Sequence, residues 1–148
     1  MGDIQNSFIV KTTPEKLYDY LADPKTIPEQ LEGSIEVDVK SEGLVLEQGN
    51  QCQLTMTRLG MTQPVKISVD ESIRGKKLSY RQVEGLFRSW RHVIQIEGHD
   101  QQSCLCKDSI YYSLPFGVLG HVLDDLIVRS DLGKILRSRS QKIREAFD

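Results

Sequence analysis

The chain has 148 residues, enough for one domain with a sizeable core, and its 39% hydrophobic and 27% charged residues are ordinary for a globular protein. A net charge of -2 argues against general nucleic-acid binding, which needs a strongly basic face. No apolar run approaches the roughly 18 residues that cross a bilayer, and the first residues lack the pattern of a signal peptide. We therefore expect a cytoplasmic protein with no stable membrane insertion, although peripheral contact with a membrane stays open.

The three cysteines, Cys52, Cys104 and Cys106, fit a reducing compartment, because an odd number does not build a disulfide framework. Cys104 and Cys106 share one face of a predicted strand, where small free cysteines are usually core residues. No set of His and Cys has the spacing of a zinc site. The sequence therefore predicts no bound metal and no cofactor.

The first elements are a strand over residues 3–11 and a helix that begins at Thr13-Pro14. Threonine caps a helix start, and proline is preformed for the first helical position. Asp23-Pro24 ends this helix, because a residue before proline avoids the helical conformation. A second, short helix is predicted over residues 26–31.

After Gly33 the apolar residues alternate, which predicts strands with one buried face. The alternating sets are Ile35, Val37 and Val39, then Cys52, Leu54 and Met56, then Val65, Ile67 and Val69. A further strand is predicted over residues 77–84. Consecutive strands joined by short turns predict an antiparallel meander.

The segment 85–120 carries the most information about function. Because side chains in a strand alternate, one strand places Trp90, His92, Ile94 and Ile96 on one face, and the next places Cys104, Cys106, Asp108, Ile110 and Tyr112 on the same face. A hairpin turning on residues 99–101 sets His92 opposite Asp108 and Trp90 opposite Ile110. An apolar and aromatic face with one polar pair suits a ligand pocket better than a plain core.

From Phe116 the apolar period is helical again. Two stripes are predicted: Leu119, Val122, Leu123 and Leu126, and then Leu132, Ile135, Leu136 and Ile143. Ser130-Asp131 and Gly133 are positions where this helix can bend or break. Its other face is basic and is expected to be solvated, with Lys134, Arg137, Arg139, Lys142 and Arg144. The order is one strand, two helices, six strands and a long helix, an α+β class.

That order resembles the START-like helix-grip superfamily, also called the SRPBCC or Bet v 1-like group, and within it the bacterial polyketide cyclase/dehydrase-type proteins. The resemblance covers essentially the whole chain and rests on four segments. They are Val10 to Pro24, Gly85-Leu86-Phe87 with Trp90 and His92, Asp108-x-x-x-Tyr112-x-Leu-Pro-Phe-Gly, and Leu132-x-x-Ile135-Leu136. Where members of this group often have a second histidine, two residues after His92, this chain has Ile94.

The resemblance implies one domain over residues 1–148, in which a curved antiparallel sheet of about seven strands grips a long C-terminal helix. Such folds often hold an internal cavity between sheet and helix for an apolar or amphipathic molecule, such as a lipid, a quinone or a polyketide. We expect ligand contacts from Tyr80, Trp90, His92, Ile94, Asp108, Ile110, Tyr112, Phe116, Leu123 and Leu126. His92 and Asp108, with Tyr112, form the expected polar handle.

Two other functions stay open. In an enzyme of cyclase or dehydrase type, Asp108 would orient His92 as a general base. The simpler interpretation is a hydrogen-bonded pair that satisfies two half-buried groups, and no nucleophile, metal or phosphate motif accompanies it. In a macromolecular interaction protein, the basic face of the C-terminal helix would contact a partner. Binding of a small hydrophobic ligand is the function that the sequence favours.

Overall fold

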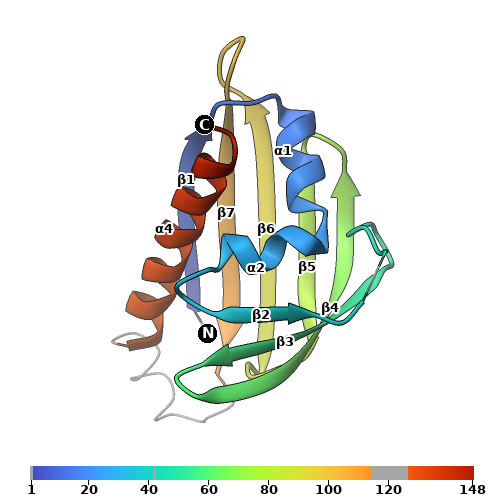
Figure 1. Cartoon of the computed structure of the whole chain (residues 1–148), viewed down its shortest axis with the longest axis vertical. Helices are drawn as coiled ribbons and strands as arrows, with labels where there is room; N and C mark the ends of the chain where they lie inside the picture. Colours follow the sequence, from blue (N-terminus) through green and yellow to red (C-terminus); the bar gives the residue numbers. More distant parts are fainter. Residues whose placement is uncertain (1, 42, 115–126) are drawn as a thin grey trace.

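The computed structural model describes residues 2–41, 43–114 and 127–148 and contains one seven-stranded antiparallel sheet (Figure 1). The strand order is β1-β7-β6-β5-β4-β3-β2, so β2 to β7 form the predicted meander and β1 joins it beside β7. The strands are β1 Gly2–Val10, β2 Glu36–Val39, β3 Gln51–Arg58, β4 Met61–Ile73, β5 Lys77–Glu84, β6 Ser89–Gly98 and β7 Cys104–Ser113.

Short helices α1 (Pro14–Leu21), η1 (Pro24–Thr26) and α2 (Ile27–Gln30) connect β1 to β2. The predicted cap at Thr13 is present, and Asp23, which we predicted only to end the first helix, caps η1. The Thr13 hydroxyl accepts a hydrogen bond from the Lys16 amide at 3.3 Å, and the Asp23 carboxylate accepts one from the Lys25 amide at 3.0 Å. These caps satisfy amides that have no partner inside the helix.

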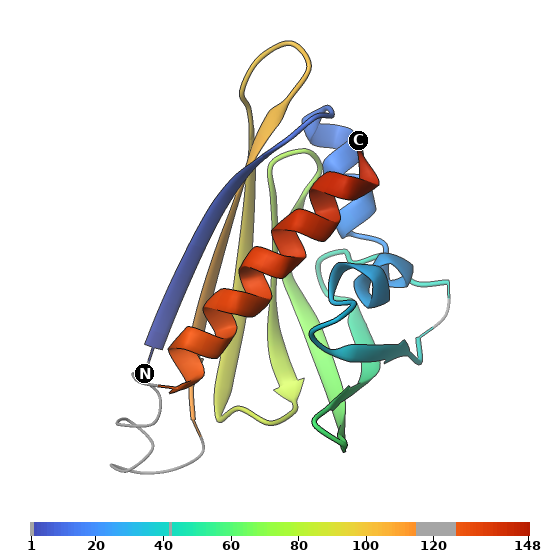
Figure 2. The ribbon, with the colours of Figure 1, turned by 60° about the vertical axis from the view of Figure 1, so that its left-hand side comes forward.

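The long helix α4 (Arg129–Ala146) crosses the concave face of the sheet, as Figure 2 shows. It packs against β1 and α2. Breaks in the register between β4 and β5, at Lys66/Ile67 and Val69/Glu71, bend the longest strand and curl the sheet. The arrangement is the expected helix-grip α+β fold.

The C-terminal helix does not break where the sequence would have allowed it, because α4 runs through Ser130, Asp131 and Gly133 without interruption. Gly133 is buried where α4 approaches β1, and a Cβ added there would lie 3.3 Å from Ile4 Cδ1. Tertiary packing therefore outweighs the low helix propensity of glycine at this position. The first predicted stripe, from Leu119 to Leu126, lies outside the described residues.

The β6–β7 hairpin has a register two residues away from the predicted one. Trp90 lies opposite Tyr112, His92 opposite Ile110, and Ile94 opposite Asp108. The turn is longer than expected and runs over residues 99–103, with the His99 amide bonded to the Ser103 carbonyl at 3.1 Å. A shift of two keeps every side chain on its predicted face and changes only its partner.

Two apolar clusters fill the concave side. The larger lies between the sheet, α1 and the end of α4, and it contains the three cysteines, which are buried and free as predicted. The smaller joins Ile110 and Tyr112 of β7 to Leu132 and Leu136 of α4.

Candidate functional site

A buried chain of polar side chains links the sheet to both α4 and α2. It consists of Tyr80 on β5, His92 on β6, Asp108 on β7, Arg139 on α4 and Gln30 on α2. Four of the five are buried, and only Tyr80 is half-buried. The chain of hydrogen bonds therefore has one end, at Tyr80, that keeps some exposure.

The two ring nitrogens of His92 have fixed roles. His92 Nε2 lies 2.9 Å from Asp108 Oδ1, and His92 Nδ1 lies 2.6 Å from the Tyr80 hydroxyl. An ionised carboxylate only accepts, so Nε2 carries the proton. In a neutral imidazole the other nitrogen then accepts, so the Tyr80 hydroxyl donates to Nδ1. The diagonal contact of His92 with Asp108 joins the pair that the sequence predicted, although their strand positions are not opposite.

Arg139 completes the network from the helix side. Its Nη1 donates to Asp108 Oδ2 at 2.5 Å, and its Nε donates to Gln30 Oε1 at 3.2 Å. Gln30 Nε2 in turn donates to Thr26 Oγ1 at 2.8 Å. The Arg139 guanidinium thus connects the sheet, through Asp108, to the short helix α2, through Gln30.

The pKa shifts follow from burial and from the Asp108–Arg139 ion pair. Burial lowers the pKa of His92, and the nearby Asp108 carboxylate opposes this only in part. Burial alone would raise the pKa of Asp108, but Arg139 and His92 outweigh it and hold that pKa below its usual value. Burial raises the pKa of Tyr80 to about 12. At neutral pH the network therefore holds one ion pair, a neutral imidazole and a neutral phenol.

This arrangement suits a hydrogen-bonding contact with a ligand better than a general base that must exchange a proton with it. Both nitrogens of His92 are occupied, so a proton could reach the imidazole only through the Tyr80 hydroxyl. That hydroxyl uses its proton on His92 and keeps its oxygen lone pairs, which makes it an acceptor. Acid/base catalysis by His92 and Asp108 stays an untested prediction.

Arg139 is the functional residue that sequence reasoning placed wrongly. We expected it on the solvated basic face, but it is only 6% exposed. The other basic residues of that face, such as Lys134 and Arg137, are exposed as predicted. A signal was present in the spacing, because Leu132, Leu136, Arg139 and Ile143 recur at helical intervals on one buried stripe.

The other predicted ligand residues lie on the same concave face. Ile94, Ile110 and Tyr112 are buried in the apolar clusters, and Trp90 is half-buried, with its ring 4.8 Å from that of Phe87 between centroids. Their role in binding is still a prediction. Phe116, Leu123 and Leu126 lie outside the described residues.

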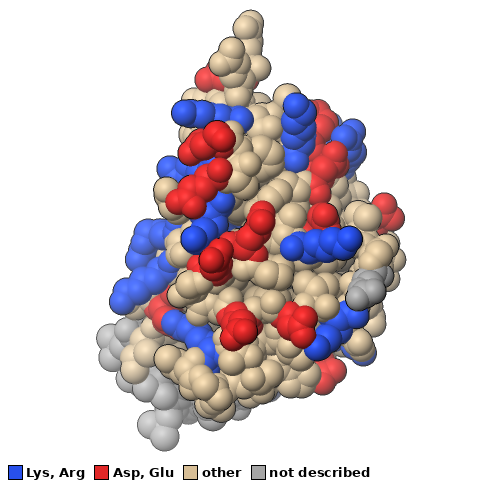
Figure 3. Space-filling view, in the orientation of Figure 1, with Lys and Arg blue, Asp and Glu red and all other residues tan. Residues whose placement is uncertain are grey.

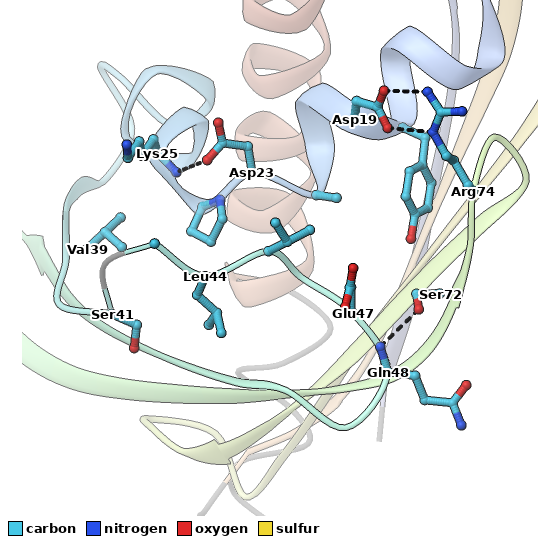
Figure 4. Close-up of a pocket in the computed structure, with 15 residues that line it drawn as sticks. Asp19, Asp23, Lys25, Val39, Ser41, Leu44, Glu47, Gln48, Ser72 and Arg74 are labelled. Carbon is cyan, nitrogen blue, oxygen red and sulfur yellow. Dashed lines mark hydrogen bonds and ion pairs between the residues drawn. The ribbon is translucent and has the colours of Figure 1, made fainter.

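A large cavity, here called the α1 cavity, opens between α1, η1 and the segment after β2, with a volume of about 1170 Å³ (Figure 4). At its rim Arg74 binds Asp19 through two hydrogen bonds of 2.7 and 3.0 Å, and the Gln48 amide donates to the Ser72 hydroxyl. None of the seven predicted ligand residues that the structure describes lines it. No pattern in the sequence pointed to this cavity.

A second hollow, the α4 groove, runs between α4, the α2–β2 connection and the tip of the β3–β4 hairpin, with a volume of about 730 Å³. Apolar side chains such as Ile35, Val37 and Ile135 line it. Arg58 at the hairpin tip and Asp131 on α4 form an ion pair that links its two sides, with Nη2 2.6 Å from Oδ1. The groove has the size of a small-molecule pocket.

Among the described residues no group of three or more His, Cys, Asp or Glu side chains is placed to hold a metal ion. Within the same part of the chain, no helix has the length and apolarity needed to cross a bilayer.

The fold is that of START-like, Bet v 1-like proteins. A START superfamily protein from Mycobacterium smegmatis superposes with a TM-score of 0.72 at 14% identity, over 98% of this chain and 96% of that one. A ginseng major latex-like protein from Panax ginseng superposes with a TM-score of 0.73 at 15% identity, over 99% of this chain and 97% of that one. A protein from Chromobacterium violaceum superposes with a TM-score of 0.78 at 13% identity, over 98% of this chain and 96% of that one.

Sequence comparison adds nothing to this structural likeness. No protein-family model matches the chain, and no curated protein matches it. The resemblance stated from the sequence is therefore confirmed at the level of the fold.

Proposed function

We propose that this protein binds a small hydrophobic or amphipathic molecule in the space between the sheet and α4. The proposal rests on the fold and above all on the buried network of Tyr80, His92, Asp108 and Arg139. Its strand partners are apolar: Ile110 lies opposite His92 and Ile94 opposite Asp108, and each belongs to one of the two apolar clusters. A ligand held there would bury its apolar part against them and meet one polar group.

Stability does not explain the network. Removing two opposite charges from water costs several kcal/mol per ion, and well-packed apolar residues often replace a buried ion pair without loss. Here Arg139 is 6% and Asp108 1% exposed, so both occupy positions where apolar side chains would pack. A role in orienting a ligand group explains the buried network better than a role in stability does.

The tautomer of His92 defines the ligand chemistry further. The Tyr80 oxygen is an acceptor, so it matches a ligand hydroxyl or N–H group. A hydroxyl-bearing lipid or a polyketide-like molecule fits this handle better than a quinone, whose carbonyl oxygens only accept. The rest of the ligand would be apolar.

Native mass spectrometry of the protein purified gently from its own host, followed by organic extraction, tests the proposal. We expect a discrete apolar adduct that carries a hydroxyl or N–H group. A protein that stays ligand-free in this measurement, and that also fails to bind a panel of hydroxylated lipids and polyketide-like compounds in solution, contradicts the proposal.

Tyr80→Phe removes the proposed handle and keeps the ring. We expect the adduct to bind about tenfold more weakly, the usual effect of losing one hydrogen bond of about 1.4 kcal/mol. Tyr111→Phe is the matched control, because Tyr111 is on the outer face of β7 and is exposed. Equal affinities of both variants, measured by titration with the extracted compound, would show that Tyr80 is not the handle.

The α4 groove is the proposed opening to this space, because it runs beside α4 and is bridged by Arg58 and Asp131. Asp131→Asn removes the ion pair while the exposed helix start keeps a polar side chain. We expect less than about 1 kcal/mol of lost stability, since a half-exposed pair is worth little. Ligand release, followed by stopped-flow fluorescence, should become several-fold faster, and an unchanged release rate would place the opening elsewhere.

A further inference from the structure

The two edges of the sheet differ in how well they resist the addition of another strand. The strand order puts β2 at one edge and β1 at the other. β2 has only four residues, and two of them, Glu36 and Asp38, are exposed carboxylates of the kind that blunt a sheet edge. β1 has nine residues, and neither a proline nor a register shift interrupts its pairing with β7. β1 is therefore the edge that is open to a further strand.

The backbone groups that β1 leaves free follow from the hydrogen bonds of its neighbours. The Ile96 amide donates to the Lys76 carbonyl at 2.8 Å, so even-numbered residues of β6 face β5 and odd-numbered ones face β7. The antiparallel registers carry this alternation across β7, whose even-numbered residues face β1 and bond to its even-numbered residues. The odd-numbered residues of β1 direct their N–H and C=O groups away from the sheet, namely Asp3, Gln5, Ser7 and Ile9.

Helix α4 contacts β1 from the concave side of the sheet and not along its edge. The Asn6 side chain donates to the Leu136 carbonyl at 3.5 Å, and a Cβ added at Gly133 would lie 3.3 Å from Ile4 Cδ1. Both contacts use even-numbered residues of β1, whereas the odd-numbered side chains lie on the convex face and are exposed. Figure 2 shows this placement, with α4 in front of the concave face and β1 at the border of the sheet.

We propose that a second copy of this chain adds to this edge, with the two β1 strands antiparallel about a two-fold axis at Ser7. Asp3 of each strand then lies opposite Lys11 of the other, the residue that follows β1. Gln5 lies opposite Ile9, and Ser7 lies opposite its own counterpart. All these residues are odd-numbered, so their free backbone groups meet, and the three central pairs exchange about six hydrogen bonds.

Charge selects this register. Asp3 and Lys11 are the only charged residues between positions 2 and 11. An axis at Ser7 forms their ion pair twice, whereas an axis one residue earlier sets Asp3 opposite Ile9. Opposite charges facing each other across two strands stabilise the pairing. Within one copy the two side chains do not meet, because eight residues of extended strand, about 26 Å, separate them.

Arg137 is a basic residue of α4 that lies beside β1, because its Nη1 and Ile4 Cδ1 are both 3.3 Å from a Cβ added at Gly133. Figure 3 shows that Lys and Arg gather on this side of the molecule. In the proposed register Ile4 lies opposite Val10, so the two copies of Arg137 are offset by six residues, about 20 Å along the strands. That offset exceeds two Debye lengths at physiological salt, so their repulsion is largely screened. Lys134 lines the α4 groove instead.

The pairing leaves the ligand site untouched. None of its residues belongs to the buried polar network or lines the α4 groove. Because the two-fold axis is perpendicular to the joined sheet, both concave faces and both α4 helices lie on the same side of it. The pairing therefore holds whether or not the proposed ligand binding does.

Sedimentation velocity of the untagged protein over a range of concentrations tests the pairing. We expect a reversible dimer with a dissociation constant in the micromolar range, since edge pairing buries a small interface. Ser7→Pro removes an amide that faces the free edge and keeps the bonds to β7. Ser7→Ala is the control, because it retains that amide. We expect dimerisation about tenfold weaker or worse in Ser7→Pro and unchanged in Ser7→Ala, with unaltered circular dichroism in both.

An exchange of charges tests the register, and it decides the question even if Ser7→Pro fails to fold. Lys11→Glu sets a carboxylate against Asp3 at both ends of the interface, so the dimer should weaken several-fold. Adding Asp3→Lys should restore the affinity, because opposite charges face each other again. Only pairing between copies gives this rescue, since the two positions are too far apart within one copy.

Three results overturn the proposal. The first is a protein that stays monomeric up to the millimolar range. The second is a dimer that neither Ser7→Pro nor Lys11→Glu weakens, because such a dimer uses another surface. The third is a double charge variant that dimerises no better than Lys11→Glu alone, because Asp3 and Lys11 then do not face each other.

Discussion

Arg139→Met is expected to destabilise the protein by about 3 to 5 kcal/mol, because it leaves the Asp108 carboxylate buried without a cation. Methionine keeps the apolar volume of the arginine stem, so the loss reports on the charge and its hydrogen bonds. Asp108 would retain His92, but a neutral imidazole does not compensate a full charge. Gln30 would also lose its contact with α4. Urea unfolding followed by circular dichroism measures the effect.

Two further variants show whether the buried charge is the cause. Arg137→Met, on the exposed face of the same helix, should change stability by less than about 0.5 kcal/mol. Adding Asp108→Asn to Arg139→Met should restore part of the lost stability, because no uncompensated charge then remains. If the double variant is no more stable than the single one, lost packing rather than lost charge explains the result.

Stability should fall on mild acidification. The pKa of His92 is lower in the folded protein than its ordinary value of 6.5, so the unfolded chain binds this proton more readily. The contribution of neutral His92 to the free energy of unfolding is therefore complete above pH 6.5 and is lost as the pH falls. Between about pH 8 and pH 5 the loss is up to about 2 kcal/mol for one proton. Asp108, whose pKa is also lowered, adds a loss of the same sign only below about pH 4.

His92→Gln should flatten this pH dependence. A glutamine amide can donate to Asp108 and accept from Tyr80, and it does not titrate. His99→Gln is the control, because His99 is exposed in the β6–β7 turn. Unfolding free energies of the two variants at a series of pH values decide the question. An equally steep fall in His92→Gln would show that other groups titrate.

Most of the fold was predictable because it rests on local periodicity. Alternation from Ile35 to Tyr112 identified the strands and their buried face, and Thr13-Pro14 marked the first helix. The β6–β7 register was not predictable, because it depends on how many residues the turn takes. A strand pattern with a period of two is the same after a shift of two, so the faces were right and the partners were wrong.

The site was predictable only from the sheet side. His92 and Asp108 stood out as polar residues on an apolar face, but Arg139 and Gln30 are residue types that normally lie in solvent. Their burial depends on where α4 and α2 meet the sheet, over separations of 31 and 109 residues. No local pattern encodes such distances. We expected the Tyr80 ring to line the ligand pocket, and the sequence did not indicate that its hydroxyl ends a chain of hydrogen bonds.

The placement of α4 has a consequence for how the protein is made. A ribosome releases the chain from its N-terminus, so β1 must wait for β7, and the whole concave face must wait for the helix that follows it. Until then Asp108 lacks Arg139, and the apolar residues of the sheet are open to water. Nascent chains that end before residue 129 should therefore be natural clients for chaperones.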